Sequence, residues 1–470
     1  MSDYIKRAAL VRPTERQLAW QGMEFYAFIH FGINTFTDKE WGLGNEDPAI
    51  FNPIAFNADQ WVDTCKAAGM RGLIFTCKHH DGFCLWPSKY TDHTVKNSPW
   101  RDGHGDAVFE VSEACRRGGI KFGIYLSPWD RHERNYGSGK YNEYFKNQLK
   151  ELLNNYGDIF CVWFDGACGE GLNGKRQVYD WEGYCRLVRE FQPSAVISVC
   201  GPDVRWCGNE AGYCRESEWS VVPACSLGIE EVQEKSQKVD NGEFSKRINL
   251  EDIDLGSREV IRDAGELIWY PAEVNTSIRP GWFYHSSEDD SVKSLEELVK
   301  IYYGSVGGNA NFLLNIPPDK NGLIHGNDAR RLKELGDYLK EEFRQNLAKN
   351  ARVFSKDIAE ETYSAEKVID GNKNTFWCPD EGVQYPELTI AFDKPAVFNK
   401  VVLMEHIQSG QRVESFALSY KENGEWKEFY QGTVIGYKKI CCFEKILARY
   451  LKLVINQSRW RPEITSVGVF

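Results

Sequence analysis

The chain has 470 residues, which exceeds the roughly 250–300 residues at which a single hydrophobic core stops growing, so one large and one smaller domain are expected. With 68 acidic and 57 basic residues, its formal charge of -11 argues against a nucleic acid or an anionic membrane as partner, because both require a basic surface. Aromatic residues make up 13% of the chain, and their flat faces suit the C–H faces of sugar rings.

Between about residues 24 and 322, short apolar runs alternate with amphipathic helical stretches. Strands are predicted at residues 24–31, 72–77, 121–127, 158–164, 195–199, 267–270 and 311–316. Helices are predicted to begin after Asn57 and Asp106, both good N-cap residues. Nearly continuous apolar strands separated by helices predict an α/β fold with a parallel sheet. Because the units approach eight and no glycine-rich phosphate turn follows the first strand, a (β/α)8-like TIM barrel is favoured over an open, doubly wound sheet.

The pattern changes after a long helix predicted at residues 328–348. Beyond it, short strands of alternating polarity follow one another without a long helix, which is typical of an antiparallel β-sandwich. The sequence therefore predicts a barrel domain over residues 1–348 and a β-sandwich domain over residues 349–470.

The cysteines and the N-terminus bear on the cellular compartment. The 14 cysteines are scattered, form no C-x-x-C pair and include the neighbours Cys441 and Cys442, so free thiols in a reducing compartment are expected. No apolar signal segment or membrane-spanning run is visible. A cytoplasmic protein is expected from the sequence as it stands, and a periplasmic or secreted one if a signal peptide preceded it.

Polar residues follow four consecutive predicted strands of the barrel. In a TIM barrel, active-site groups lie at the carboxyl ends of the strands. The residues at these ends and in the adjoining loops are His30, Glu40, Trp41, His79, His80, Tyr125, Trp129, Asp130, Trp163 and Asp165. A single strand-end histidine is commonly a packing residue, but four such strand ends together favour a functional site.

A metal site is the alternative for His79, His80 and Asp81, because imidazole and carboxylate suit zinc or iron. No third histidine arrives at ligand spacing, so no metal is predicted.

Several long strings resemble the α-L-fucosidases of glycoside hydrolase family 29. They are FIHFGINTF, KHHDGFCLW, YLSPWD, VWFDGA and GGNANFLLNIPPDKNGLI, and the resemblance runs over residues 18–344. It implies a retaining enzyme on a (β/α) barrel with Asp165 as nucleophile and no required cofactor. It also implies that His30, His79 and His80 bind fucose hydroxyls. Glu40, Trp41, Tyr125 and Trp163 are expected in the pocket wall.

The resemblance also suggests the second carboxyl group. Retaining glycosidases use two carboxyl groups about 5–5.5 Å apart, one as nucleophile and one as acid/base. The segment RWCGNEAGYCRESEW offers Glu210, Glu216 and Glu218. RWCGNEAG is similar to the subfamily selective for α-1,3/1,4-linked fucose, which implies Glu210, with Glu218 as the main alternative.

The string IRPGWFYH is similar to the same subfamily and implies Arg279 and Trp282 at the fucose or the adjoining sugar. Fucosylated oligosaccharides, Lewis-type glycans among them, are the expected partners. Two alternatives stay open: another retaining exo-glycosidase such as a galactosidase, and a non-catalytic sugar-binding protein.

The C-terminal region resembles a discoidin, or coagulation-factor type C, sandwich. The resemblance rests on AEKVIDGNKNTFW near its start and on RYLKLVINQ and RPEITSVGVF at its end. It implies a carbohydrate-binding module or a scaffold, with a structural calcium ion as an option. Trp377 and Trp460 are candidates for either a ligand surface or the core.

Overall fold

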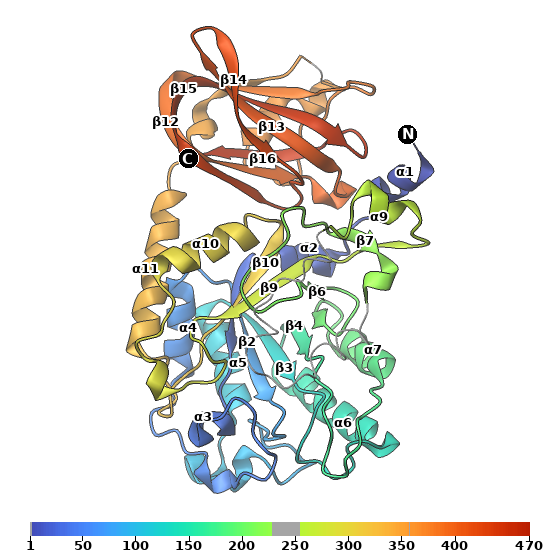
Figure 1. The fold of residues 1–470 in the computed structure, drawn as a ribbon. Coiled ribbons are helices and arrows are strands. Elements are labelled where there is room, and N and C mark those ends of the chain that lie inside the picture. Colours follow the sequence, from blue (N-terminus) through green and yellow to red (C-terminus); the bar gives the residue numbers. More distant parts are fainter. Residues whose placement is uncertain (1, 228–253, 357) are drawn as a thin grey trace.

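The computed structural model describes residues 2–227, 254–356 and 358–470. A barrel and an antiparallel β-sandwich lie one above the other (Figure 1). The barrel is a parallel sheet with the order β5-β4-β3-β2-β1-β10-β9-β6. Its strands are β1 (Phe25–Ile29), β2 (Gly72–Lys78), β3 (Lys121–Leu126), β4 (Ile159–Phe164), β5 (Val196–Val199), β6 (Arg205–Trp206), β9 (Ala272–Ser277) and β10 (Ala310–Asn315).

The two outer strands of this order, β5 and β6, meet and nearly close the sheet. A parallel bridge joins Ser198 to Val204, and the backbone N–H of Val199 donates to Val204 O over 3.1 Å. The predicted (β/α)8-like barrel is therefore confirmed. All the carboxyl ends of its strands face one side, where an active site is expected.

Helices surround the sheet, as the alternating pattern predicts. Asn57 caps α4 by accepting from the backbone N–H of Gln60 over 3.0 Å, and Asp106 caps α5 through Phe109 N over 2.9 Å. Both predicted helix starts are confirmed. The α-helices of the described residues are α1 (Asp3–Leu10), α2 (Glu15–Gln21), α3 (Ile33–Thr37), α4 (Ala58–Ala67), α5 (Ala107–Gly118), α6 (Gly139–Asn155), α7 (Trp181–Phe191), α9 (Arg258–Arg262), α10 (Leu295–Ser305) and α11 (Gly326–Glu342).

Two predicted elements need correction, and two barrel strands were not predicted. The strand predicted at residues 267–270 is β8 (Leu267–Trp269), which lies outside the barrel and pairs antiparallel with β7 (Val221–Pro223). The barrel strands in this region are β6 and β9. They lack an apolar run, because β6 has two residues and β9 alternates polar side chains, AEVNTS, toward a polar barrel interior. The helix predicted over residues 328–348 is α11, which ends at Glu342.

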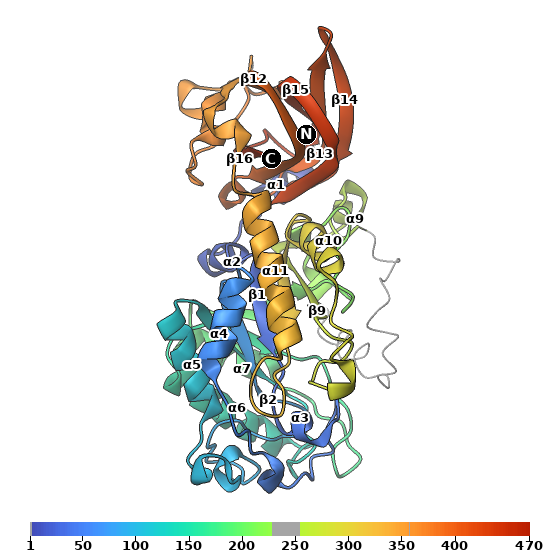
Figure 2. The same ribbon diagram turned by 90° about the vertical axis from the view of Figure 1, so that its left-hand side faces the viewer.

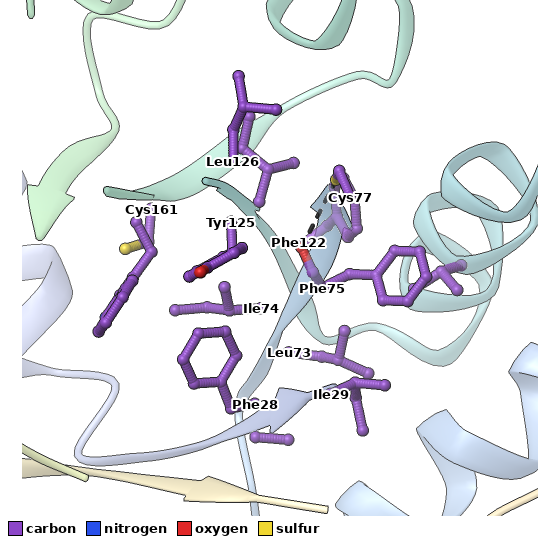
Figure 3. Packing of buried hydrophobic residues seen from close by; sticks show 14 of the residues in the cluster. Phe28, Ile29, Leu73, Ile74, Phe75, Cys77, Phe122, Tyr125, Leu126 and Cys161 are labelled. Atoms are coloured by element: carbon purple, nitrogen blue, oxygen red, sulfur yellow. Dashed lines mark hydrogen bonds between the residues drawn. The ribbon is translucent and has the colours of Figure 1, made fainter. Parts of the chain in front are cut away.

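The barrel core is closely packed. Figure 3 shows side chains of the neighbouring strands β1 to β4 in contact, among them Phe28, Ile74 and Tyr125. Phe28 lies 5.6 Å from Tyr125 between ring centroids in an edge-on arrangement. Because these strands pack side by side, the polar groups at their carboxyl ends lie close together.

A buried ion pair crosses this core between β2 and the loop after β3. Lys78 Nζ donates to Asp130 Oδ2 over 2.8 Å and to Gln148 Oε1 over 2.9 Å, and both charged side chains are fully buried. Asp130 Oδ1 accepts the backbone N–H groups of His132 and Glu133. Asp130, which the strand-end pattern includes among the mouth residues, therefore anchors its own loop.

Removing one partner of this pair is expected to destabilise the barrel strongly. Lys78→Met leaves the Asp130 carboxylate buried without its cation, and we expect the free energy of unfolding to fall by about 3–5 kcal/mol. The matched control Lys333→Met removes an exposed pair with Asp337 on α11 and should cost less than about 1 kcal/mol. Urea unfolding followed by tryptophan fluorescence measures both, and equal losses would contradict the structural role of the buried pair.

The C-terminal domain is the predicted antiparallel sandwich, with the strand order β11-β12-β15-β13-β14 and β16 paired to β12. The predicted boundary after residue 348 falls in the 3-10 helix Leu347–Asn350. Trp377 is fully buried in the core, whereas Trp460 is partly exposed. The strands are β11 (Arg352–Phe354), β12 (Glu387–Glu405), β13 (Val413–Glu422), β14 (Glu425–Gly432), β15 (Lys439–Ser458) and β16 (Ile464–Val469).

The sandwich packs against the amino ends of β1 and β10, on the side opposite the barrel mouth. Gly308 and Lys439 form an antiparallel bridge, and Asn309 N donates to Lys438 O over 3.0 Å. At the start of β1, Glu24 forms an ion pair with Lys438 over 2.6 Å. Figures 1 and 2 both place the sandwich at one end of the molecule, with α11 leading toward it. The sandwich therefore lies far from the carboxyl ends of the barrel strands.

Two further observations concern the part of the chain that the structure describes. None of its helices combines the length and the apolar character needed to cross a membrane. All 14 cysteines lie in it, and all are free, most of them buried.

Candidate active site

Asp165 lies at the carboxyl end of β4, where the other strand-end residues surround it. Its Oδ2 accepts from the hydroxyl of Tyr125 over 2.9 Å, and its Oδ1 accepts from Ala167 N over 2.8 Å. His80 Nε2 lies 3.9 Å from Oδ2. The side chain keeps 23% of its surface exposed, so a carboxylate in a fixed orientation remains open to a ligand.

Hydrogen bonds fix which ring nitrogen of His30 and His80 carries the proton. Asn315 donates its Nδ2 to Trp282 O, so its Oδ1 accepts from His30 Nδ1 over 2.8 Å. The hydroxyl of Ser127 donates to a backbone carbonyl and therefore accepts from His80 Nδ1 over 2.7 Å. In both rings the neutral tautomer leaves Nε2 as an acceptor for a ligand hydroxyl group.

His79 completes this group of rings. Its ring centroid lies 5.6 Å from that of His30 and 4.0 Å from that of His80, and its buried Nδ1 has no hydrogen-bond partner among the residues that the structure describes. Burial lowers the pKa of His79 well below its usual value. It also lowers the pKa of His30 to about 3 and that of His80 to about 4. The site therefore presents three neutral imidazoles at neutral pH.

These buried histidines predict a loss of stability in mild acid. The unfolded chain binds protons at histidine below about pH 6.5, whereas folded His80 binds one only near pH 4, so the free energy of unfolding falls as pH decreases through this window. Each such group contributes a slope of about 1.4 kcal/mol per pH unit. Burial raises the pKa of Asp81 to about 7. The folded protein therefore holds a proton on Asp81 that the unfolded chain has lost, and this group increases the free energy of unfolding as the pH decreases, which opposes the effect of the histidines.

The contribution of His80 is therefore obtained as the difference in the pH dependence of unfolding between the wild type and a His80 variant. We expect the pH dependence of unfolding in His80→Gln to be shallower than in the wild type by about 1.4 kcal/mol per unit between pH 6 and pH 5. Urea unfolding at several pH values measures both slopes. Identical slopes would show that His80 is protonated in the folded protein.

Glu40 and Trp41 lie beside this pocket and have different roles. Glu40 accepts the backbone N–H groups of Trp282 over 2.8 Å and Phe283 over 3.0 Å. It also accepts from His285 Nε2, and this hydrogen bond raises the pKa of His285 to about 9. Trp41 packs edge-on against His80 with ring centroids 5.7 Å apart. Glu40 thus holds the loop that carries Trp282, and Trp41 forms part of the aromatic surroundings of His80.

The three acidic candidates of the loop after β6 occupy different environments. Glu210 is partly buried and accepts from Trp282 Nε1 over 3.2 Å, and the Trp282 ring lies 5.1 Å from that of His30. Glu218 is fully buried and forms ion pairs with two arginines. Glu216 is exposed, and its backbone carbonyl accepts from Thr433 in the sandwich. Among the three, Glu210 is the one next to the histidines.

A cleft of about 730 Å³ opens beside Glu210 and Trp282, and Arg279 contributes to its lining. The Arg279 side chain is fully buried, with Nε bonded to Asp328 over 2.9 Å and Nη1 to Asp289 over 2.9 Å. Within the described part of the chain, its Nη2 has no hydrogen-bond partner. Arg279 and Trp282, both predicted at the sugar, thus border this cleft, but the ion pairs of Arg279 also hold the loop in place.

Sequence reasoning missed Glu273, which lies in the barrel interior beneath the site. It is fully buried and accepts from Trp163 Nε1 over 2.7 Å, from Ser198 Oγ over 3.1 Å and from the Tyr26 hydroxyl. Trp163 in turn stacks on Tyr125 with ring centroids 5.4 Å apart. The period-two polar pattern of β9 is the signal that would have located this residue.

The arrangement of the described side chains does not support a metal site at His79, His80 and Asp81. In residues 2–227, 254–356 and 358–470, no group of three or more His, Cys, Asp or Glu side chains is arranged to hold a metal ion. The Asp81 carboxyl group accepts instead from Phe83 N over 2.7 Å.

Comparisons with known proteins agree with the two-domain architecture. Residues 21–342 match the family described as Alpha-L-fucosidase, and residues 351–467 match the F5/8 type C domain. Alpha-L-fucosidase 1 of Arabidopsis thaliana is 41% identical over 97% of this chain and 87% of its own length.

Two solved structures extend the likeness to three dimensions. A glycoside hydrolase 29 family member from a rumen bacterium has a TM-score of 0.81 and 40% identity, over 98% of this chain and 77% of its own. A Ruminococcus gnavus family 29 fucosidase in complex with fucose has a TM-score of 0.84 and 31% identity, over 98% and 95% of the two chains.

Proposed function

The chain belongs to the α-L-fucosidase family of glycoside hydrolases, and from this premise we propose that it releases terminal α-1,3- or α-1,4-linked L-fucose from oligosaccharides with retention of configuration. The observation that carries the proposal is the arrangement around Asp165, whose oriented and partly exposed carboxylate lies next to neutral histidines and aromatic rings. The complex of the related Ruminococcus gnavus enzyme with fucose supports the same sugar here.

Asp165 is the proposed nucleophile. Its carboxylate attacks C1 of fucose, and the bond from C1 to the leaving oxygen breaks, so that a glycosyl-enzyme forms. The hydrogen bonds from Tyr125 and Ala167 restrict its rotation before the reaction, which reduces the entropy lost on reaching the transition state. The stack of Tyr125 on Trp163 and the bond from Trp163 to Glu273 hold this arrangement from below.

Glu210 is the proposed acid/base. It gives a proton to the departing oxygen in the first step and takes one from the attacking water in the second, after which Asp165 is released. Two contacts support this choice over the neighbouring acids. Glu210 lies beside Trp282 at the cleft, whereas the Glu218 carboxylate is enclosed by Arg205 and Arg215. The reaction uses side chains only, so we propose that no cofactor takes part.

The pocket chemistry suits fucose, which has an axial hydroxyl group and an apolar methyl group. The Nε2 atoms of His30 and His80 are acceptors for sugar hydroxyls. Trp41, Trp282 and Phe283 provide apolar surface close to the same rings. The cleft at Glu210 and Trp282 offers room for the next sugar, and Lewis-type glycans are the proposed natural substrates.

Hydrolysis of matched aryl glycosides tests the proposal. We expect rapid release from an aryl α-L-fucoside, slow or no release from the aryl galactosides, and α-L-fucose as the first product in NMR spectra. Faster cleavage of a galactoside would make the protein a galactosidase. Binding of fucose without turnover would make it a sugar-binding protein. A Lewis-type trisaccharide that remains intact would overturn the linkage alone.

A further inference from the structure

The segment that carries Glu210 connects the barrel mouth to the sandwich. It leaves β6 at Trp206 and reaches Trp282 through Glu210. It then runs back along α10, where Tyr213 lies under Lys300 and Cys214 Sγ donates to Gly304 O over 2.8 Å. The segment ends in β7, beside the sandwich (Figure 1).

Glu218 links the part of the segment that precedes Glu210 to the part that follows it. One carboxylate oxygen pairs with Arg205 at the start of β6, and the other accepts from Arg215 N over 3.0 Å. Arg215 also donates through Nη1 to Cys207 O over 3.1 Å, just before the loop reaches Glu210. The backbone path on both sides of Glu210 is therefore fixed to one buried carboxylate.

The sandwich holds the far end of the same segment by polar contacts. Gln411 Oε1 accepts from Ser220 N over 2.7 Å, and the Thr433 hydroxyl donates to Glu216 O over 3.1 Å. Arg459 lies over the Trp219 ring at 3.7 Å from its centroid. In the same segment, Glu218 O accepts from Asn309 Nδ2, and Asn309 Oδ1 accepts from Tyr437 N of the sandwich.

Apolar contacts cover both faces of β7 where it lies against the sandwich. Val221 packs in a buried cluster with Ile407 of the sandwich, and Val222 packs in another with Val434. Residues 216–222, the far end of the segment, are thus enclosed between the two domains, at the end of the barrel opposite the active site.

We propose that the C-terminal sandwich is a positioning element for the proton donor: through Gln411 and Thr433 it fixes residues 216–220, and through Glu218 this fixes the loop that carries Glu210. The inference rests on the proposed function. The sandwich thereby affects the reaction from the opposite end of the barrel, where it does not contact a sugar bound beside Asp165.

Two variants of the full-length protein test the inference. Gln411→Met keeps the side-chain volume but removes the acceptor of Ser220 N, and Thr433→Val removes the donor to Glu216 O. Thr465→Val is the matched control, because the Thr465 hydroxyl donates within the sandwich, to Lys373 O and Thr375 O. Gln411→Glu keeps an acceptor oxygen and should restore activity.

The readout is the dependence on the leaving group. For phenyl α-L-fucoside, whose leaving group needs a proton, we expect kcat/KM to fall about tenfold in the first two variants. For 2,4-dinitrophenyl α-L-fucoside, which needs little protonation, we expect a change of less than about twofold. A purely structural role would lower both rates in proportion to the folded fraction, which thermal unfolding measures.

The outcomes separate the two proposals. If the wild type cleaves neither fucoside, the proposed function fails. If the wild type is active and both variants show the leaving-group dependence of Thr465→Val, the positioning role is overturned. If Gln411→Met does not fold, Thr433→Val and Gln411→Glu decide the question, and an unchanged dependence in Thr433→Val overturns the role.

Discussion

Replacing Asp165 with alanine is expected to lower kcat for an aryl α-L-fucoside by a factor on the order of 10⁴, because the proposed covalent bond to C1 then has no nucleophile. The loss should be similar for good and poor leaving groups, since both need the nucleophile. The hydroxyl of Tyr125 and the N–H of Ala167 lose their acceptor, so the fold should be checked by circular dichroism. Turnover at the wild-type rate would remove Asp165 from the reaction.

A small external anion should distinguish a missing nucleophile from a disturbed pocket. Azide can enter the space left by the Asp165 carboxylate and attack C1 directly, which releases the aryl oxide and forms β-L-fucosyl azide with inverted configuration. The matched control is Asp106→Asn, since asparagine caps a helix as well as aspartate does and Asp106 caps α5. This control should keep wild-type turnover and form no azide adduct of inverted configuration.

Much of the barrel could be predicted because its first five strands are short apolar runs, and polar residues follow the first four of them. Residues 121–127, for example, contain β3, and Tyr125 in it lies beside Asp165. β6 and β9 could not be predicted in the same way. β9 has polar side chains that bond to residues of other strands inside the barrel, and these partners lie far away in the sequence, as the pair of Glu273 with Trp163 shows.

The site was predicted to a similar extent. Strand ends bring His30, His79, His80 and Asp165 together in any closed parallel barrel. The loop after β6 offered three carboxyl groups of equal appearance, however, and periodicity does not tell which one is exposed to the cleft. That difference comes from Arg205 and Arg215, which enclose Glu218 and leave Glu210 beside Trp282.

The position of the sandwich also required the structure. Its strands could be predicted from alternation, but its contact with the amino ends of β1 and β10 is made by backbone bonds such as Asn309 N to Lys438 O. Backbone contacts of this kind leave no sequence pattern. They limit the sandwich to the end of the barrel away from the sugar pocket, so any glycan it binds would lie outside that pocket.

The Glu210→Ala variant should separate substrates by their need for a proton. On a Lewis-type trisaccharide we expect kcat/KM to fall by about 10²–10⁴-fold, the usual contribution of general acid catalysis. On an aryl α-L-fucoside with a good leaving group the first step needs little protonation, so the loss in kcat/KM should be much smaller. Steady-state kinetics on both substrates measures the contrast.

The second half of the reaction gives an independent check on Glu210. Without the base, water attacks the glycosyl-enzyme slowly, so a burst of aryl alcohol should precede a slow steady state. Azide needs no base and should accelerate turnover, forming α-L-fucosyl azide with retained configuration, opposite to the product expected for Asp165→Ala. The matched control is Glu216→Ala, because Glu216 is exposed and contacts the sandwich through its backbone. Equal losses on both substrates, without azide rescue, would show that Glu210 is not the acid/base. Because Glu218 is held between two arginines, a result of that kind would direct the search to another loop of the barrel mouth.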